Sequence, residues 1–388
     1  MTHLVVIAGE ESGDLHAAEF IHTLKNRNPN LKITGIGGQH MQTAGAELIS
    51  DLARHAVTGV VEVLRHIRLF YRGFRQIKAH LKATKPDLLV LVDYPGFNLR
   101  LLKYVKTHLN LKIIYYISPQ IWAWKPKRIR LIQNYVDHMA VILPFEKDLY
   151  QKAQVPVSFV GHPLVNKVPS NINQTALQST LNIPQGPRIV ALLPGSRRNE
   201  VQHLMPVLKA MATILHQAQP NLHFVIPIAP SLNQQLIQAY LHDVSFSYSL
   251  IAGHAIDTMS CSDVVVVASG TASLECALLG KPMCIIYKAP WFTYYVATKL
   301  MRVKFLGLCN LLQNKMIVPE FLQHDCNAPE LARAVTALLN HPPDAAYMIT
   351  QLQQLKLGLS QQQADQSIAQ LIEQNLHPSA AHTILTTS

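Results

Sequence analysis

The sequence has few charged residues and no long apolar run. Only 15% of its 388 residues are Asp, Glu, Lys or Arg, whereas 49% are hydrophobic. This composition excludes an intrinsically disordered chain, because a chain this apolar can bury a core. No apolar stretch approaches the ~18–20 residues that span a bilayer. The N-terminus also lacks the basic segment of a signal peptide. We therefore expect a protein that is soluble or peripheral to a membrane.

Cysteine is scarce as well, and the metal-binding motifs are missing. The five cysteines all lie after residue 260 and form no Cys-x-x-Cys pair. This predicts reduced thiols in a cytoplasmic protein rather than a disulfide framework. The scattered histidines form no His-Glu-x-x-His motif, and no Asp/Asn-rich calcium loop is present, so we expect no metal and no cofactor.

Acidic residues are rarest between residues 63 and 136. This segment holds 15 of the 34 lysines and arginines but only two acids, Asp87 and Asp93, in a chain of net charge +11. This excess of positive charge is compatible with three kinds of partner: nucleic acid, a membrane surface and an anionic substrate.

Short apolar segments alternate with helical patterns along most of the chain. Their continuous apolar character indicates strands buried on both faces, hence parallel sheets covered by helices. These segments are 3–8, 87–92, 112–117, 138–143, 188–193, 223–228 and 263–268. We expect two doubly wound, Rossmann-like α/β domains facing a cleft. Their bounds are 1–165 and 166–328, with a polar linker at 166–180. A helical segment, 329–388, would pack back on the first domain or be exchanged in a dimer.

The strongest ligand signal is "LLPGSRRNEV" (192–201), which runs from a strand into a helix. Ligands of open parallel sheets bind beyond the carboxyl ends of the strands. The amides at a helix N-terminus favour an anion. Gly195 allows close approach, Ser196 can donate a hydroxyl, and Arg197 offers a planar fork matched to phosphate. The alternative is that the arginines solvate a surface turn and pair with Glu200.

A second turn, "ASGTASLE" (268–275), repeats this pattern. Ser269, Gly270 and Thr271 could approach a phosphate, while Glu275 accepts from ribose hydroxyls. The alternative is a Thr-capped helix with Glu275 as capping-box support. Two such turns in one domain predict that the second domain binds a nucleoside diphosphate.

The first domain offers weaker candidates. In "AGEESGDLHAAEF" (8–20), Ser12 and Asp14 suit helix N-caps, whereas Gly13 would let a ligand approach. "GIGG" (35–38) fails the dinucleotide fingerprint, because His40 stands where its last glycine belongs.

Asp93 and His162 are the other candidates in this domain. Asp93 ends the strand 87–92 and is either a turn residue or a general base. His162 is a candidate ligand contact, although a single histidine is more often structural.

The segment 59–81 predicts an amphipathic helix. Four arginines line one side, next to the apolar face. Either that face packs in the core, or the helix meets acyl chains and anionic lipid. Nucleic acid is less favoured, because bulky aliphatics interrupt the basic residues. The residues proposed to face lipid are Val60, Val63, Leu64, Ile67, Phe70, Tyr71 and Phe74.

The ordered motifs resemble one family, the lipid-A-disaccharide synthases of lipid A biosynthesis. They cover more than three quarters of the chain, and as a set they are far more specific than any single member. They are "GEESGD" (9–14), "GVVEVL" (59–64), "DYPGFN" (93–98), "SPQIWAWKPKR" (118–128), "LPFE" (143–146), "FVGHP" (159–163), "LLPGSR" (192–197), "ASGTASLE" (268–275) and "NLLQNKMIVPEFLQ" (310–323).

This resemblance implies a glycosyltransferase B fold and an inverting transfer. The donor would be UDP-2,3-diacylglucosamine and the acceptor 2,3-diacylglucosamine 1-phosphate, joined by a β-1,6 bond. Asp93 would deprotonate the acceptor, Arg197 would stabilise the departing diphosphate, and Glu275 and Asn310 would hold ribose or uracil. Many members carry a second carboxylate where this chain has Gly96. Association with the cytoplasmic face of the inner membrane, and a homodimer in some members, are implied too.

Three other functions stay open on the sequence. A transferase that adds N-acetylglucosamine to undecaprenyl-linked muramyl peptide shares the fold, but its glycine-rich N-terminal signature is not seen. A UDP-sugar 2-epimerase would leave the basic helix unexplained. A non-catalytic, membrane-surface nucleotide-binding protein is the third.

Overall fold

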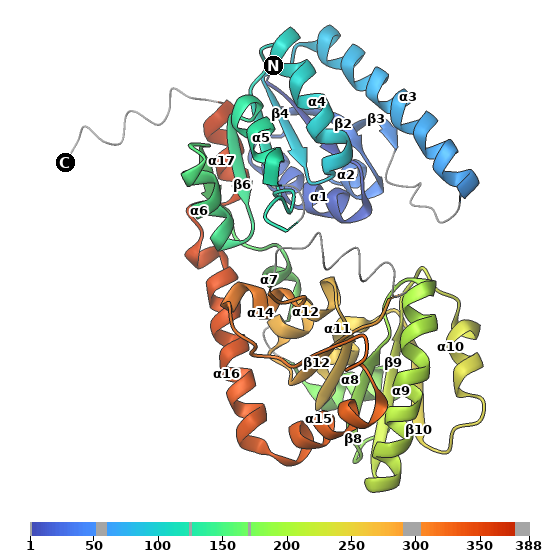
Figure 1. Ribbon diagram of the computed structural model, residues 1–388. Coiled ribbons are helices and arrows are strands. Elements are labelled where there is room, and N and C mark those ends of the chain that lie inside the picture. Colours follow the sequence, from blue (N-terminus) through green and yellow to red (C-terminus); the bar gives the residue numbers. More distant parts are fainter. Residues whose placement is uncertain (1, 52–59, 124–125, 170–171, 290–303, 377–388) are drawn as a thin grey trace, which may run out of the picture. The chain divides into compact units, whose positions relative to one another are not determined.

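The chain forms two compact units (Figure 1). The computed structural model describes residues 2–51, 60–123, 126–169, 172–289 and 304–376. Unit 1 comprises Met1–Pro163 and Leu359–Ser388, and unit 2 comprises Leu164–Gly358. The tail segment 329–388 is thus divided between the two units. Within the described ranges, no helix combines the length and apolar character needed to cross a membrane.

Unit 1 is built on a parallel sheet with strand order β3-β2-β1-β4-β5-β6-β7 among the described residues. The strands are β1 (His3–Ala8), β2 (Lys32–Gly37), β3 (Glu47–Asp51), β4 (Leu88–Val92), β5 (Ile113–Tyr116), β6 (His138–Val141) and β7 (Val157–Phe159). Every residue of β1 and β4 is buried. Burial on both faces explains why these strands are apolar at successive positions.

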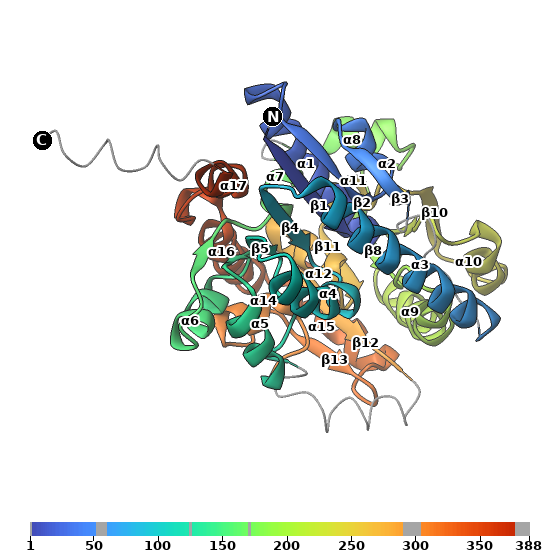
Figure 2. The ribbon, with the colours of Figure 1, turned by 90° about the horizontal axis from the view of Figure 1, so that it is seen from above.

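Helices cover both faces of this sheet (Figure 2). They are α1 (Glu11–Arg27), α2 (Gln39–Thr43), α3 (Val60–Thr84), α4 (Pro95–His108), α5 (Ile129–Tyr135), α6 (Pro144–Lys152) and, from the C-terminal return, α17 (Ile368–Leu376). Val5 and Ile7 of β1 pack in one core layer with residues of α3, α4 and α5. Leu4 and Val6 pack in the other layer with residues of α1, α2 and α17.

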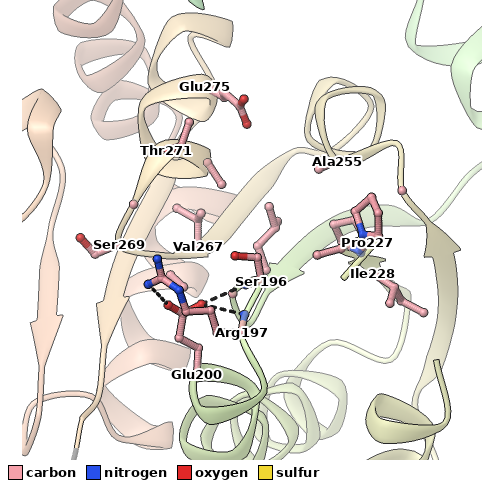
Figure 3. A pocket seen from close by; sticks show the side chains of 18 of the residues that line it. Ser196, Arg197, Glu200, Pro227, Ile228, Ala255, Val267, Ser269, Thr271 and Glu275 are labelled. Carbon is pink, nitrogen blue, oxygen red and sulfur yellow. Dashed lines mark hydrogen bonds and ion pairs between the residues drawn. The ribbon is translucent and has the colours of Figure 1, made fainter. Parts of the chain in front are cut away.

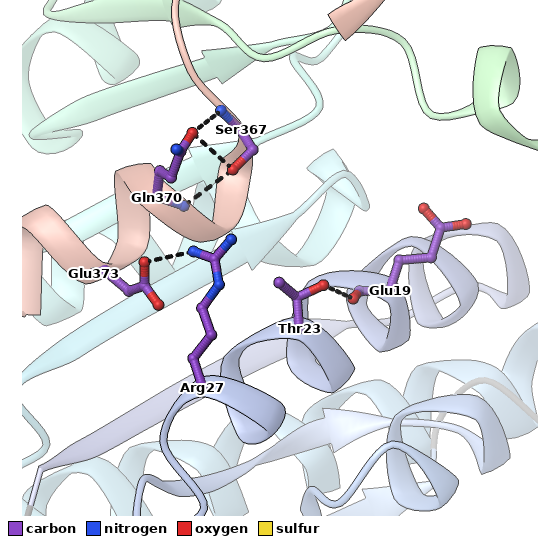
Figure 4. Close-up of polar contacts among 6 residues, drawn as sticks. All are labelled: Glu19, Thr23, Arg27, Ser367, Gln370 and Glu373. Carbon is purple, nitrogen blue, oxygen red and sulfur yellow. Dashed lines mark hydrogen bonds and ion pairs between the residues drawn. The ribbon is translucent and has the colours of Figure 1, made fainter.

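The C-terminal return closes the second layer of unit 1. Asp365 bonds to the exposed edge of β7: its N–H donates to the Phe159 carbonyl at 2.9 Å, and its carboxylate accepts from the Phe159 N–H at 2.8 Å. Helix α17 then lies against α1, where Arg27 pairs with Glu373 at 2.8 Å (Figure 4). Its buried Ile372 belongs to the α1 core layer.

Unit 2 repeats the architecture with strand order β10-β9-β8-β11-β12-β13 in its described part. The strands are β8 (Arg188–Leu193), β9 (Leu222–Ile228), β10 (Ser247–Ala252), β11 (Val264–Ala268), β12 (Met283–Tyr287) and β13 (Glu320–Leu322). The helices are α7 (Leu164–Lys167), α8 (Gln174–Thr180), α9 (Arg198–Ala218), α10 (Gln234–Leu241), α11 (Ala255–Ser260), α12 (Thr271–Leu279), α14 (Leu308–Gln313), α15 (Ala328–Asn340) and α16 (Pro342–Leu359). Two doubly wound α/β units confirm the predicted fold class.

Candidate active site

The turn after β8 holds a carboxylate at the start of α9 (Figure 3). The N–H groups of Ser196 and Arg197 donate to Glu200 Oε2 at 2.9 and 3.1 Å, and Arg197 Nη1 donates to Glu200 Oε1 at 3.1 Å. Gly195 has a φ of +104°, and a Cβ there would lie 2.3 Å from Glu200 Oε2. Glycine is therefore required for an oxyanion to reach these donors.

This contact is the pairing with Glu200 that the sequence left as the alternative to phosphate binding. It also shows the chemistry of the turn, because two amides and a guanidinium converge on one anionic group. The Arg197 side chain is 82% exposed and thus keeps most of its surface in water. Any anion that binds these amides has to displace the Glu200 carboxylate.

The turn borders a cavity of about 440 Å³ at the carboxyl ends of β8, β9 and β11. Ser269, Gly270 and Thr271 line its other side, and Glu275 lies one helical turn further along α12 (Figure 3). The structure therefore brings both predicted anion-binding turns to one cavity of unit 2. Its remaining walls come from the β9 end at Pro227 and from the loop after β10.

The N-terminus of α12 differs from the Thr-capped helix considered above. Thr271 is the first helical residue, Gly270 is the N-cap, and no side-chain cap is found in this described segment. The first amides of α12 are thus left without a side-chain acceptor beside the cavity. Burial raises the pKa of the half-buried Glu275, while the charge of Lys167 opposes this shift.

Asn310, which the resemblance assigns to ribose or uracil, holds a loop in this structure. It is fully buried, and its Nδ2 donates to the Val318 carbonyl and to Glu320 Oε1, both at 2.7 Å. Its Oδ1 accepts from the N–H groups of Ile317 and Val318 at 2.8 and 2.9 Å. Both donors and both acceptor positions are used to hold the loop before β13. These bonds favour a structural role for the Asn310 side chain, and its contact with ribose or uracil stays an untested prediction.

Replacing Asn310 by alanine is expected to destabilise the protein while UDP affinity stays unchanged. The substitution leaves buried backbone groups without partners, each costing ~1–3 kcal/mol. Thermal unfolding should show a lower Tm, and calorimetric titration with UDP well below that Tm should give the wild-type Kd. A weakened UDP affinity at full folding would support the ligand role.

The candidates at the start of α1 have different roles from those expected. Ser12 and Asp14 lie inside α1, so neither caps that helix. Asp14 instead accepts from the N–H groups of Gly38, His40 and Met41 at 2.7, 3.0 and 3.1 Å and thereby caps α2. The Gly38 amide of "GIGG" and two amides at the start of α2 are thus occupied by the Asp14 side chain, as expected of a segment that fails the dinucleotide fingerprint.

The structure gives the positions of three other candidates of the first domain, but it does not test whether they contact substrate. Ser12 is exposed and Gly13 buried in the first turn of α1, after the carboxyl end of β1. His162 is buried near the junction with unit 2, and its N–H donates to the Leu359 carbonyl at 2.9 Å. Substrate contacts of these three residues stay predictions.

Asp93 lies in a strained turn at the end of β4. It and Tyr94 have φ values of 43° and 45°, two successive left-handed residues that are not glycine. The Asp93 carbonyl accepts from Tyr115 Oη at 2.6 Å and from Asn98 Nδ2 at 2.8 Å. Such strain of ~1–3 kcal/mol per residue persists only where surrounding contacts impose it, and it is frequent at functional sites. Sequence reasoning missed Asn98 and Tyr115 as its supports, although "DYPGFN" contains Asn98.

The environment of Asp93 suits proton transfer near neutral pH. Burial, and then the negative charge of Glu10, raise the pKa of Asp93 to about 6, against the lowering effect of the Tyr94 backbone hydrogen bond. A general base is most effective when its pKa lies near the operating pH. The charge that acts on Asp93 therefore comes from Glu10 of "GEESGD", a residue that the sequence analysis did not single out.

Helix α3 packs against the core at its C-terminal end. The rings of Phe70 and Phe74 meet Phe97 edge-to-face with centroids 5.1 and 5.4 Å apart, and Ile77 is fully buried. Phe70 and Phe74 are thus half-buried against α4, and their contact with lipid stays a prediction. Tyr71 is 60% exposed. The side chains of Val60, Val63, Leu64 and Ile67 lie outside the described residues.

The fold and the cavity define the class of protein. Solved structures of similar architecture include the glycotransferase of kitacinnamycin, with a TM-score of 0.61 at 16% identity over 96% of this chain and 98% of that one. A putative UDP-N-acetylglucosamine 2-epimerase from Listeria monocytogenes has a TM-score of 0.61 at 13% identity, covering 89% and 90%. The chain has the fold of glycosyltransferase B enzymes and of these epimerases.

The family follows from sequence comparison. The model of the lipid-A-disaccharide synthetase family matches residues 4–375. Lipid-A-disaccharide synthase 1 of Legionella pneumophila (strain Lens) is 54% identical over 371 residues, which cover 96% of this chain and 97% of that protein. The chain belongs to the lipid-A-disaccharide synthetase family and is a hexosyltransferase of lipid A biosynthesis.

Proposed function

We propose that this enzyme transfers the sugar of UDP-2,3-diacylglucosamine to 2,3-diacylglucosamine 1-phosphate, with inversion, giving the β-1,6-linked disaccharide 1-phosphate and UDP. One observation carries the donor half of this proposal: the amides of Ser196 and Arg197 hold an oxyanion at the edge of the unit 2 cavity. A diphosphate presents the same kind of oxygen with more charge, and it takes the place of the Glu200 carboxylate.

Different residues of the cavity bind different parts of the donor. Arg197 and the Gly195–Ser196 turn stabilise the negative charge that builds on the diphosphate as the anomeric C–O bond breaks. Ser269, Gly270 and Thr271 approach the phosphates from α12, whose first amides lack a side-chain cap. Glu275 accepts from the ribose hydroxyls.

Asp93 supplies the base for the acceptor half. Its carboxylate takes the proton from the acceptor hydroxyl as that oxygen attacks the anomeric carbon of the donor. A pKa of about 6 keeps Asp93 ionised at neutral pH yet basic enough to accept the proton.

The acyl chains of both substrates would be embedded in a membrane. We therefore also propose that the enzyme binds peripherally to anionic lipid at the cytoplasmic face of the inner membrane. The exposed Tyr71, Arg72 and Arg75 of α3 support it. An amphipathic helix with aromatic and basic residues at its surface suits the headgroup region. A homodimer stays a prediction.

UDP release from the purified enzyme tests the reaction. We expect release from UDP-diacylglucosamine only when diacylglucosamine 1-phosphate is added, with a disaccharide phosphate as co-product by mass spectrometry. Release with a muramyl-lipid acceptor instead, or epimerisation of a UDP-sugar, would contradict the substrate assignment and leave the cavity assignment standing.

A further inference from the structure

A second buried polar cluster lies at the same sheet edge as Asp93. Glu146 is in the first turn of α6, which follows β6, and Trp122 is in the loop that follows β5. Strands β4, β5 and β6 are adjacent and parallel, so the residues after their carboxyl ends share one edge of unit 1. Neither Glu146 nor Trp122 has a role in the mechanism described so far.

The side chain of Glu146 is a buried carboxyl group, and only one of its two oxygens has a hydrogen-bond partner among the described residues. Its side chain is 1% exposed, and its Oε1 accepts from Trp122 Nε1 at 3.0 Å. Its Oε2 is buried and has no hydrogen-bond partner among the described residues. A buried polar atom without a partner is costly, so its retention calls for an explanation beyond packing.

The protonation state of Glu146 is coupled to its surroundings. Burial raises its pKa to about 8, although the hydrogen bond from Trp122 lowers it, and the charge of Asp93 adds to the rise. Glu146 is therefore neutral when Asp93 is ionised at pH 7. Among the described residues, Tyr150 is a further titratable group that interacts with Glu146, and its hydroxyl shares a 2.7 Å hydrogen bond with Ser118.

Trp122 is held from two sides. Its ring meets Phe145 edge-to-face with centroids 5.1 Å apart, and its indole N–H is fixed by Glu146. The indole is nevertheless only half-buried. A rigid, partly exposed aromatic ring with few rotatable bonds is a frequent wall of binding sites for small organic ligands.

We propose that Glu146 is a positioning residue for the acceptor: its hydrogen bond to Trp122 holds the indole near Asp93, so that indole and carboxylate together bind the acceptor sugar. This inference rests on the proposed function. Trp122 contacts the sugar, and Glu146 acts through Trp122. In its neutral form Glu146 keeps a second negative charge away from the base.

Three variants separate this role from simple packing. Glu146→Leu removes the acceptor of the indole N–H, and Trp122→Phe removes its donor. We expect either to raise the KM for the acceptor about tenfold, the loss expected for one hydrogen bond. The KM for the donor and the Kd for UDP should stay within about twofold, because the donor cavity lies in unit 2. Glu330→Gln on α15 serves as the control, because Glu330 is a half-buried carboxylate of unit 2 that pairs with Arg333.

Glu146→Gln tests the proton. The amide oxygen still accepts from Trp122, so the acceptor KM at pH 7 should remain near wild type. In the wild-type enzyme, kcat/KM for the acceptor should rise through about pH 6 as Asp93 ionises, and fall above about pH 8 as Glu146 ionises. The fall is expected because a buried charge with an unpaired oxygen draws water into the site. Glu146→Gln should abolish only that alkaline limb.

The outcomes are distinguishable. No acceptor-dependent UDP release from the wild-type enzyme contradicts the proposed function itself. Wild-type release with an unchanged acceptor KM in Glu146→Leu and Trp122→Phe overturns the inference alone. An alkaline limb that persists in Glu146→Gln also overturns the inference. This measurement tests the inference even if Glu146→Leu does not fold.

Discussion

Replacing Asp93 by asparagine is expected to lower the turnover of acceptor-dependent UDP release by about 10²–10⁴-fold, the usual contribution of a positioned general base. Asparagine has nearly the same shape and tolerates a left-handed φ better than most residues. The turn at φ 43° should therefore survive. The measurement is kcat for UDP release at saturating substrates. Unchanged turnover would contradict the assignment of Asp93 as the base.

The stability of the same variant provides the control. Because the folded-state pKa of Asp93 is raised to about 6, the folded protein loses stability as the pH rises from about 4, the ordinary value, to about 6. Asparagine carries no charge and avoids this cost. Thermal unfolding at pH 7.5 should thus give a Tm equal to or above that of the wild type. A lower Tm would mean that a loss of turnover reflects misfolding.

Replacing Arg197 by alanine is expected to lower kcat about 10²–10³-fold, or ~2.7–4 kcal/mol, the loss typical of one preorganised donor at a developing anion. The guanidinium is largely exposed and pairs with the neighbouring Glu200, so its removal should not disturb the core. Steady-state rates and UDP affinity would be measured together. We expect kcat to fall more than UDP affinity, because charge on the diphosphate grows as the bond breaks.

Arg198 offers a matched control for this prediction. It is the next residue, also exposed, and does not line the cavity. Arg198→Ala should retain kcat within about twofold, since exposed charges away from a site contribute little. Equal losses in the two variants would indicate a general effect of positive charge rather than a specific contact of Arg197.

The strands predicted from sequence were β1, β4, β5, β6, β8, β9 and β11, which are short apolar segments. Strand β12 was missed, although it is apolar and mostly buried. Strand β2 was missed too, and its sequence KITGIG contains two glycines. Gly35 is required there, because a Cβ would lie 1.8 Å from the Val6 carbonyl oxygen of β1. The outer strand β10 was also missed, since most of its residues are half-buried.

Adjacent sequence was most informative where the partners are local. The amides of Ser196 and Arg197 and the Arg197 guanidinium hold the Glu200 carboxylate, four residues or fewer away, and their contact with a phosphate stays a prediction. Asp14 was assigned to the nearest helix start, but its partners begin 24 residues away at Gly38. Asn310 was assigned by resemblance, yet its side chain is fully used by the loop that follows it.

The return of the chain to unit 1 has a consequence for the folding of the protein during its synthesis. During synthesis from the N-terminus, residues 2–163 emerge first, but the layer against α1 lacks the buried Leu371 and Ile372 until the chain is almost complete. Unit 2 is continuous and can fold before that point. Unit 1, which is made first, is therefore completed last, and until then its α1 layer leaves apolar side chains uncovered.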